Sequence, residues 1–271
     1  MPRYFLEVSY KGTAYSGFQA QENANTIQAE VEKAIDILFR PPSLLSEEGK
    51  EMRLRLTGSS RTDTGVHALQ NFFHFDAILP IHQWQGTEDE ATFIYKINAI
   101  LPGDIVAKKL YAVNDAAHCR FDAISLEYNY YIYDHKNPFF KERAFFYPYT
   151  LDLEKLHEAA IVIREYQDFT SFSKRNTQAK TFICNIQKSK WIIENDCLIY
   201  NIKANRFLRG MVRALTATML KVGRNKISIQ ELRNIIEVKD CTKASFAVPA
   251  HGLFLLSVQY PNTYFENNSE S

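Results

Sequence analysis

The amino-acid sequence predicts an α+β fold built on a large, mainly antiparallel sheet. Stretches with strand patterns and stretches with helical patterns mix along its 271 residues, without the regular strand–helix alternation of a doubly wound fold. Neither a GxGxxG nor a GxxxxGK motif occurs, so no nucleotide cofactor has a visible binding site. The length suits one large domain or two smaller ones, and we expect a boundary near residue 115.

The first half of the chain predicts four strands and two helices. The strands are expected at 3–10, 53–57, 67–79 and 105–113. Alternating polarity over 53–57 and abundant aromatic side chains over 67–79 are typical of strands. Helical spacing of apolar residues over 27–39, with Thr26 as the N-cap, predicts the first helix. A second helix over 91–99 is expected to end before Pro102 and Gly103. Residues 11–21, 41–52 and 80–90 are expected to be loops or polar connections.

The second half predicts four strands and three helices. The strands are expected at 126–135, 184–196, 198–204 and 252–259, and the helices at 153–164, 206–222 and 228–237. Tyrosines on both faces of 126–135 indicate that both faces contact the core or a ligand. Residues 118–123 are expected to be a loop, 168–180 a basic loop, and 261–271 a disordered tail.

Composition argues against several classes of protein. The formal net charge is +1 and the mean hydropathy is −0.28, typical of a soluble protein. No apolar run approaches the roughly 18 residues needed to span a bilayer, and the N-terminus lacks the pattern of a signal peptide. We therefore expect a cytoplasmic protein. The four cysteines form no CxxC pair and the seven histidines form no ligand pair, so neither a metal site nor a redox motif is expected.

The segment from Cys197 to Gln230 is strongly basic, because it contains no Asp or Glu. Its cations are Lys203, Arg206, Arg209, Arg213, Lys221, Arg224 and Lys226. The helix expected over 206–222 would place on one face Arg206, Arg209, Gly210, Arg213, Ala217 and Lys221. An ordinary solvated face is the common alternative, but such a face normally carries both signs of charge. A purely positive stripe with small residues favours contact with phosphate groups.

Two further segments suit RNA contact. The basic loop contains Lys174, Arg175, Asn176, Gln178 and Lys180, whose side chains fit phosphate and sugar groups. A mobile surface loop is an equally good interpretation of that segment. Arg120, in the stretch HCRF, is the third candidate.

Residues 57–68, TGSSRTDTGVHA, place one carboxylate among small residues. An aspartate in such a turn most often forms an Asx-turn or caps a helix. However, Arg61 lies two positions before Asp63, and the next carboxylate is Asp76. An arginine at contact distance favours the ionised carboxylate, which could act as a nucleophile or a base. A glycosidase pair would need a second carboxyl group that the sequence does not reveal.

With these residues in view, the chain resembles the tRNA pseudouridine synthase A family from about residue 4 to residue 260. The most specific block is Arg61–Ala68, which is similar to the RTDxGVHA motif of the family. Supporting blocks are Tyr10–Thr13, Tyr15–Gln19, Asn98–Asp104, His118–Phe121, Tyr128–Tyr130, Asp168–Phe172, Phe207–Arg213 and Gly252-Leu253. The chain departs from the family pattern at Ser60, usually glycine, at Arg206, usually a small residue, and at Cys119, commonly alanine.

The resemblance implies isomerisation of uridine to pseudouridine in the tRNA anticodon arm, at positions 38, 39 and 40. Asp63 would be the catalytic aspartate, Arg213 would pair with it, Tyr128 would stack on the uracil and is a candidate to take the C5 proton, and Leu253 would pack beneath the base. Arg61 would fill the helix stack as the base leaves. The residues expected to contact RNA are Arg61, His118, Arg120, Lys174, Arg175, Asn176, Gln178, Lys180, Arg206 and Arg209.

The resemblance also implies a pseudouridine synthase fold, with helices flanking a mixed sheet and two related subdomains around a central cleft. Residues 1–114 would form the subdomain with the RTD motif, and residues 115–260 the second, RNA-binding subdomain. No cofactor and no metal are implied. The implied partners are tRNA and a second copy of the chain.

Two other functions compete with a synthase. A non-catalytic RNA-binding protein could use the same scaffold, but it would not need Asp63, Tyr128 and Arg213 together with Arg61. A hydrolase using Asp63 would need a metal cluster or a second acid, which the sequence does not locate. The presence of all four of these residues therefore favours the synthase.

Overall fold

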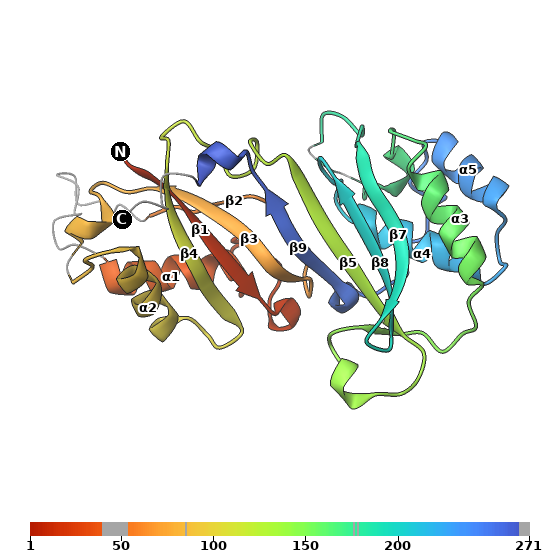
Figure 1. Ribbon diagram of the computed structural model, residues 1–271, viewed down its shortest axis with the longest axis horizontal. Helices are drawn as coiled ribbons and strands as arrows, with labels where there is room; N and C mark the ends of the chain where they lie inside the picture. Colours follow the sequence, from red (N-terminus) through yellow and green to blue (C-terminus); the bar gives the residue numbers. More distant parts are fainter. Residues whose placement is uncertain (40–53, 85, 176, 178, 266–271) are drawn as a thin grey trace. The chain divides into compact units, whose positions relative to one another are not determined.

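The computed structural model describes residues 1–39, 54–84, 86–175, 177 and 179–265 (Figure 1). These residues form nine strands and five α-helices, which confirms the predicted α+β class. The chain divides into two compact units, Met1–Ile124 with the residues from Val258 onward, and Ser125–Ser257. The division thus falls after residue 124 rather than near 115, and the last strand passes from the second unit to the first. None of the helices described is long and apolar enough to cross a bilayer.

The first unit contains an antiparallel sheet and two helices. Its elements are β1 (Arg3–Tyr10), α1 (Ile27–Phe39), β2 (Thr57–Gly58), β3 (His67–Asp76), α2 (Glu90–Ile100) and β4 (Ile105–Val113). Strand β1 lies between β4 and β3, and β2 pairs with β3. Thr26 and Asp89 cap α1 and α2, because each side-chain oxygen accepts a backbone N–H of the first turn.

The strand expected over 53–57 is much shorter than predicted. Pairing begins only at Thr57, and residue 53 and the expected loop 41–52 lie outside the described residues. The backbone groups of Leu56 form hydrogen bonds with side chains of α1 instead of with a neighbouring strand. Its N–H donates to Glu32 (2.9 Å) and its carbonyl accepts from Gln28 (2.8 Å). These hydrogen bonds to α1 take the place of the strand pairing that the alternating polarity predicted.

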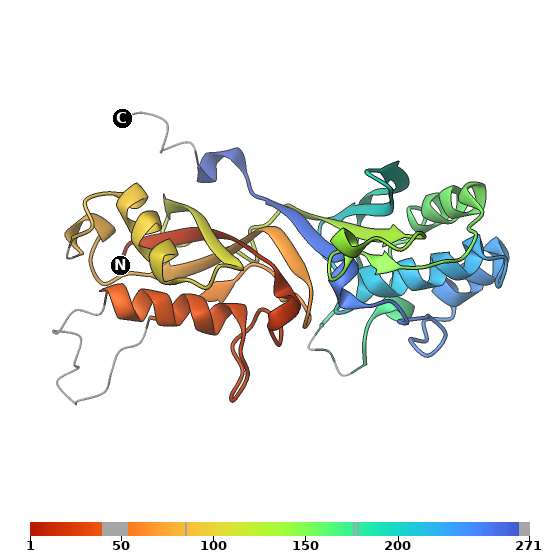
Figure 2. The ribbon, with the colours of Figure 1, turned by 90° about the horizontal axis from the view of Figure 1, so that it is seen from below.

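Residues 261–265 belong to a folded segment, whereas a disordered tail was expected from residue 261. Asn262–Tyr264 form a 3-10 turn, η6, that covers aromatic residues of the sheet of the first unit. Tyr260 packs edge-on against Phe5 and Phe72, and Phe265 packs on Tyr111. Figure 2 shows α1 and η6 on opposite sides of these strands. Aromatic burial thus orders a polar-looking segment; residues 266–271 lie outside the described part of the chain.

The second unit contains five strand segments and three helices. Its elements are β5 (Ser125–Tyr133), β6 (Phe145–Phe146), α3 (Leu153–Ile163), β7 (Ile186–Glu194), β8 (Cys197–Ala204), α4 (Met211–Gly223), α5 (Ile229–Glu237) and β9 (Leu253–Gln259). The strand order is β9-β5-β8-β7, and β6 pairs in parallel with β5. Asn195 and Asp196 join β7 to β8 with positive φ values of 50° and 60°, which suits a tight hairpin. Ser228 and Glu231 form the capping box of α5.

Helix α4 differs from the expected helix 206–222. It begins at Met211, because Gly210 has a left-handed backbone (φ 75°) that a helix interior does not allow. Arg206 and Arg209 therefore precede the helix, and the predicted basic stripe along one helix face is wrong. All residues of α4 except Arg213 and Lys221 are buried, because the helix packs against β5, α3 and α5.

Candidate functional site

Asp63 lies in the loop that joins β2 to β3 in the first unit. Thr62, directly before it, is buried, and its backbone carbonyl accepts the N–H of Phe18 (3.1 Å). The Asp63 carbonyl accepts the N–H of Val66 (3.1 Å), so a tight turn follows in which Gly65 has a φ of 80°. Asp63 itself is partly exposed. The loop thus holds the carboxylate between a buried residue and a turn.

A buried polar network lies beneath this loop. The Tyr10 hydroxyl shares a hydrogen bond of 2.8 Å with Thr62 Oγ1 and accepts one of 3.0 Å from the Asn71 amide. Asn71 Oδ1 accepts from the hydroxyls of Ser59 (2.6 Å) and Ser60 (3.2 Å). Ser60, which replaces the usual glycine of the family pattern, therefore bonds within the network. Sequence reasoning missed Asn71, although a polar residue in an aromatic strand was a usable signal.

The other family blocks of the first unit support the Asp63 loop. A Cβ atom on Gly12 would lie 2.0 Å from the carbonyl oxygen of Val66, so only glycine fits there. The Gly12 N–H donates to His67 Nδ1 (3.1 Å). Gly17 has a φ of 106°, and a Cβ atom there would lie 3.2 Å from the carbonyl oxygen of Thr62. Blocks far apart in the sequence therefore meet around one carboxylate.

The third of these blocks ends at Asp104, which fixes the loop after β1. Its backbone carbonyl accepts the N–H of Lys11 (2.9 Å), and its carboxylate accepts the hydroxyl of Tyr15. Desolvation and this carboxylate raise the pKa of Tyr15 above its usual value. Tyr15 is therefore a neutral donor at physiological pH.

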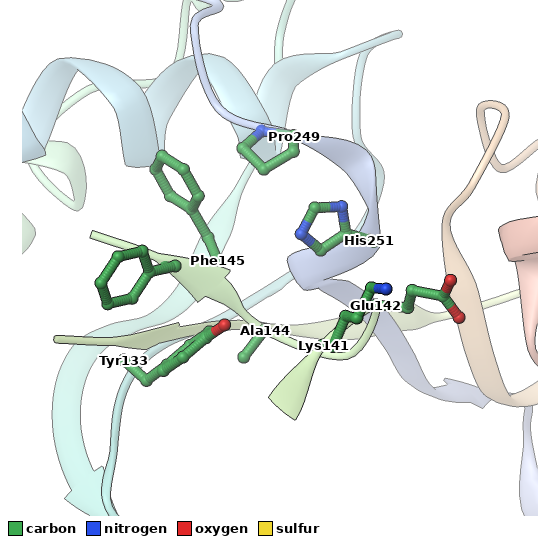
Figure 3. A pocket seen from close by; sticks show the side chains of 8 residues that line it. Tyr133, Lys141, Glu142, Ala144, Phe145, Pro249 and His251 are labelled. Carbon is green, nitrogen blue, oxygen red and sulfur yellow. The ribbon is translucent and has the colours of Figure 1, made fainter. Parts of the chain in front are cut away.

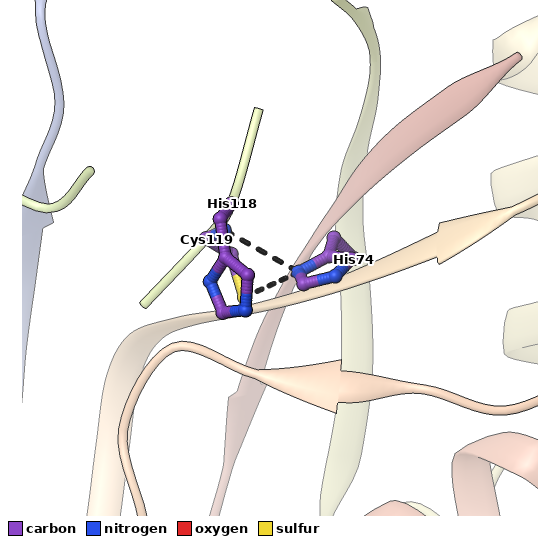
Figure 4. Close-up of side chains that lie close together, drawn as sticks. All are labelled: His74, His118 and Cys119. Carbon is purple, nitrogen blue, oxygen red and sulfur yellow. Dashed lines mark hydrogen bonds between the residues drawn. The ribbon is translucent and has the colours of Figure 1, made fainter. Parts of the chain in front are cut away.

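His74, His118 and Cys119 form the one cluster of possible metal ligands among the residues described (Figure 4), which sequence spacing did not predict. His118 Nδ1 accepts the backbone N–H groups of Arg120 (3.1 Å) and Phe121 (3.3 Å), and His74 Nδ1 accepts that of Cys119 (3.3 Å). A nitrogen that accepts a backbone N–H leaves the proton on the other ring nitrogen. The cluster therefore suits neutral imidazoles that hold a loop, and fits a metal ion poorly.

Three predicted catalytic residues lie in the second unit. Tyr128, on β5, is buried with its ring edge-on to Phe207, the centroids 5.1 Å apart. Arg213, in the first turn of α4, donates to the carbonyl of Val248 from Nε (3.0 Å) and Nη2 (2.7 Å). Leu253 is the buried first residue of β9, five positions after Val248. One short segment, 248–253, thus holds the Arg213 guanidinium at one end and carries Leu253 at the other.

A hollow of about 380 Å³ lies beside this segment in the second unit (Figure 3). It is lined by Tyr133, Lys141, Glu142, Ala144, Phe145, Phe146, Pro249 and His251. Burial lowers the pKa of His251, so this imidazole is neutral near pH 7. Aromatic, charged and small side chains share the lining, and sequence reasoning did not single it out.

Two of the predicted RNA-binding residues of the second unit, Lys174 and Arg209, lie next to each other. The backbone N–H of Lys174 donates to the carbonyl of Arg209 (3.0 Å), and the Lys174 side chain passes directly over Gly210. Arg175, Lys180 and Arg209 are exposed, and Arg206 is partly exposed. Asn176 and Gln178 lie outside the described residues. These predicted RNA-binding cations therefore lie on two loops rather than on one face of a helix.

In the first unit, Arg61 and Arg120 are exposed and His118 is partly buried. Arg61 is in the loop of Asp63, and Arg120 is at the tip of the loop after β4. The His118 ring lies between His74 and Phe121, with centroid distances of 4.6 and 4.2 Å. His118 thus packs against β3 and against its own loop, whereas the Arg120 side chain is exposed.

Comparison with known proteins is consistent with these features. The family model described as tRNA pseudouridine synthase matches residues 7–122 and 166–261. A tRNA pseudouridine synthase A from Parabacteroides distasonis is 42% identical over 98% of both chains. One from Azobacteroides pseudotrichonymphae is 39% identical over 98% of this chain and all of its own. One from Staphylococcus aureus is 34% identical over 93% of this chain and 89% of its own.

These matches establish the class of protein. Pseudouridine synthases are isomerases, and the chain belongs to the tRNA pseudouridine synthase family.

Substituting Gly12 by alanine tests the support of the Asp63 loop. The added methyl group would overlap the Val66 carbonyl, so we expect a loss of stability of about 1–3 kcal/mol and a displaced loop. Turnover of tRNA should fall at least about ten-fold. Gly103→Ala is the control, because its Cβ meets no atom within 4 Å. Equal urea midpoints and turnover for both variants would contradict the packing argument.

Replacing His74 by asparagine tests the neutral imidazole. Burial and the neighbouring His118 lower the pKa of His74 to about 4, below its ordinary 6.5. Because the unfolded chain then takes up the proton first, stability falls as the pH drops from about 6.5 towards 4. Between pH 7 and pH 5 this amounts to about 2 kcal/mol. Urea unfolding at pH 7 and pH 5 should therefore show that His74→Asn loses about 2 kcal/mol less stability than wild type over this range. An equal loss of stability in both proteins would refute the neutral state of His74.

Proposed function

We propose that this chain converts uridine to pseudouridine in the anticodon arm of tRNA, at positions 38, 39 and 40, with Asp63 as the essential catalytic group. The observation that supports the aspartate most is its loop. A partly exposed carboxylate follows a buried threonine and precedes a glycine turn, and several family blocks pack around it. Such rigid presentation of one carboxylate suits a reacting group better than an ordinary turn.

The reaction is an isomerisation that needs no net oxidation or hydrolysis. The N1–C1′ bond breaks, the uracil turns, and C5 bonds to C1′. The C5 proton then leaves, and N1 is protonated. Asp63 could attack the sugar, attack the base, or remove a sugar proton, and each route uses the ionised carboxylate.

The other catalytic roles fall on residues of the second unit. In this proposal Arg213 pairs with the aspartate, Tyr128 stacks on the uracil and accepts the C5 proton, and Leu253 packs beneath the base. The two hydrogen bonds to Val248 support the role of Arg213, because they restrict its guanidinium to one orientation. The edge contact with Phe207 likewise restrains the Tyr128 ring.

The target base has to leave the stem before it reacts, at a cost of roughly a few kcal/mol. Arg61 is exposed in the loop of Asp63, which supports a role in filling the gap left by the base. The other proposed RNA-binding residues are His118, Arg120, Lys174, Arg175, Asn176, Gln178, Lys180, Arg206 and Arg209. Exposed cations among them suit phosphate contacts that position the tRNA. We further propose that the enzyme acts as a cytoplasmic homodimer.

Replacing Asp63 by asparagine tests the proposal. Asparagine keeps the size but removes the charge, so release of tritium from tRNA labelled at uridine C5 should fall by at least about 10³-fold. Binding of tRNA should stay within about three-fold of wild type, because Asp63 acts on the reacting atoms. Thr64→Ala, an exposed neighbour, is the control and should release tritium normally.

The assay should be run with and without EDTA. Release that is lost with EDTA would favour metal-dependent chemistry instead. Equal release by Asp63→Asn and wild type would refute the role of the aspartate, and tRNA binding without release by wild type would refute the activity on that RNA.

A further inference from the structure

Hydrogen bonds hold several backbone groups of the loop His118–Asp122 in the first unit. Asp122 Oδ2 accepts the N–H of His118 (2.6 Å), and the Asp122 N–H donates to the His118 carbonyl (3.1 Å). His118 Nδ1 accepts the N–H groups of Arg120 and Phe121. The Cys119 thiol donates to the carbonyl of Thr57 (3.1 Å). Arg120 is the exposed cation at the tip of this loop.

Two tyrosines from beyond the last strand bond to the same loop. The Tyr264 hydroxyl donates to Asp122 Oδ2 (2.7 Å), the oxygen that also accepts the His118 N–H. The Tyr260 hydroxyl donates to the carbonyl of Cys119 (2.5 Å). These bonds join positions more than 140 residues apart. The end of the chain thus supplies donors that the loop does not contain.

The two tyrosines are themselves held in place. Tyr260 packs against Phe5 at a centroid distance of 5.3 Å and against Phe72 at 5.1 Å. Tyr264 packs at 6.0 Å from both Phe5 and Tyr260. Because the rings are fixed on the sheet, their hydroxyl groups are fixed relative to the loop.

We propose that Tyr264 and Tyr260 are positioning residues, which hold the His118–Asp122 loop so that Arg120 meets a phosphate of the tRNA. The inference rests on the proposed function, in which Arg120 contacts RNA. A guanidinium on a pre-ordered loop binds without the entropy cost of ordering that loop. Loss of the Tyr264 hydroxyl removes one donor from the Asp122 carboxylate, so the loop samples more conformations before RNA binds.

A double-mutant cycle of Tyr264→Phe and Arg120→Ala tests this link. The readouts are the Kd for tRNA from filter binding, its dependence on salt, and kcat from tritium release. Arg120→Ala should raise Kd about five-fold and lower the salt slope by about one. Tyr264→Phe should raise Kd about three-fold, but should add nothing in the Arg120→Ala background. In Tyr264→Phe the kcat should stay within about two-fold of wild type, because Tyr264 touches no reacting group.

Tyr166→Phe is the matched control. Its hydroxyl also donates to a carboxylate, Glu237 Oε1 (2.6 Å). Tyr166 and Glu237 both lie in the second unit, and neither is a proposed RNA-binding residue. It should leave Kd and the salt slope unchanged. Urea midpoints close to wild type for both phenylalanine variants would show that the fold is intact.

Three results would overturn the inference. The first is an unchanged Kd in Tyr264→Phe while Arg120→Ala weakens binding, and the second is an equal effect of Tyr264→Phe in both backgrounds. The third is an unchanged Kd in Arg120→Ala, which would remove the phosphate contact but leave the isomerase activity standing. Failure of the wild type to release tritium would refute the activity alone, since the cycle in Kd needs no turnover.

Discussion

The hydrogen bond between the hydroxyls of Tyr10 and Thr62 is the constraint on which the candidate site depends. It is buried, and it joins the end of β1 to the residue directly before Asp63. Asn71 extends it to Ser59 and Ser60, so the part of the loop before Asp63 is tied to β1 and β3. A buried polar group without its partner costs about 1–3 kcal/mol, which discourages alternative loop conformations. The position of the carboxylate is therefore determined by the core of the first unit.

A similar arrangement recurs elsewhere in the chain: a proposed functional side chain lies on a loop or at the start of a helix, and hydrogen bonds to its surroundings hold it in place. Arg120 projects from a loop that His118, Asp122 and two tyrosines hold. Arg213 lies at the start of a buried helix and is fixed by the carbonyl of Val248. Loops leave room for a bulky RNA, and the bonds beneath them preserve the geometry.

Features that depend on neighbouring residues could be predicted from the sequence, whereas features that depend on tertiary contacts could not. Local signals gave the α+β class, the N-cap at Thr26 and the helix that begins near residue 228. The motif around Asp63 and the family were also visible. The sequence did not show that Gly210 takes a left-handed backbone, and so the basic stripe was placed on a helix. Nor could it show the aromatic packing that orders Tyr264, or the meeting of His74 with His118, because these contacts depend on the tertiary fold.

The most direct test of the account compares Thr62→Val with Thr62→Ser in single-turnover assays on tRNA. Valine keeps the shape but removes the hydroxyl that bonds to Tyr10, whereas serine keeps the hydroxyl. If the buried network positions Asp63, the rate in Thr62→Val falls at least about ten-fold, tRNA binding is retained, and Thr62→Ser stays within about three-fold of wild type. A Thr62→Val enzyme as fast as wild type would contradict the claim that this hydrogen bond determines the active geometry.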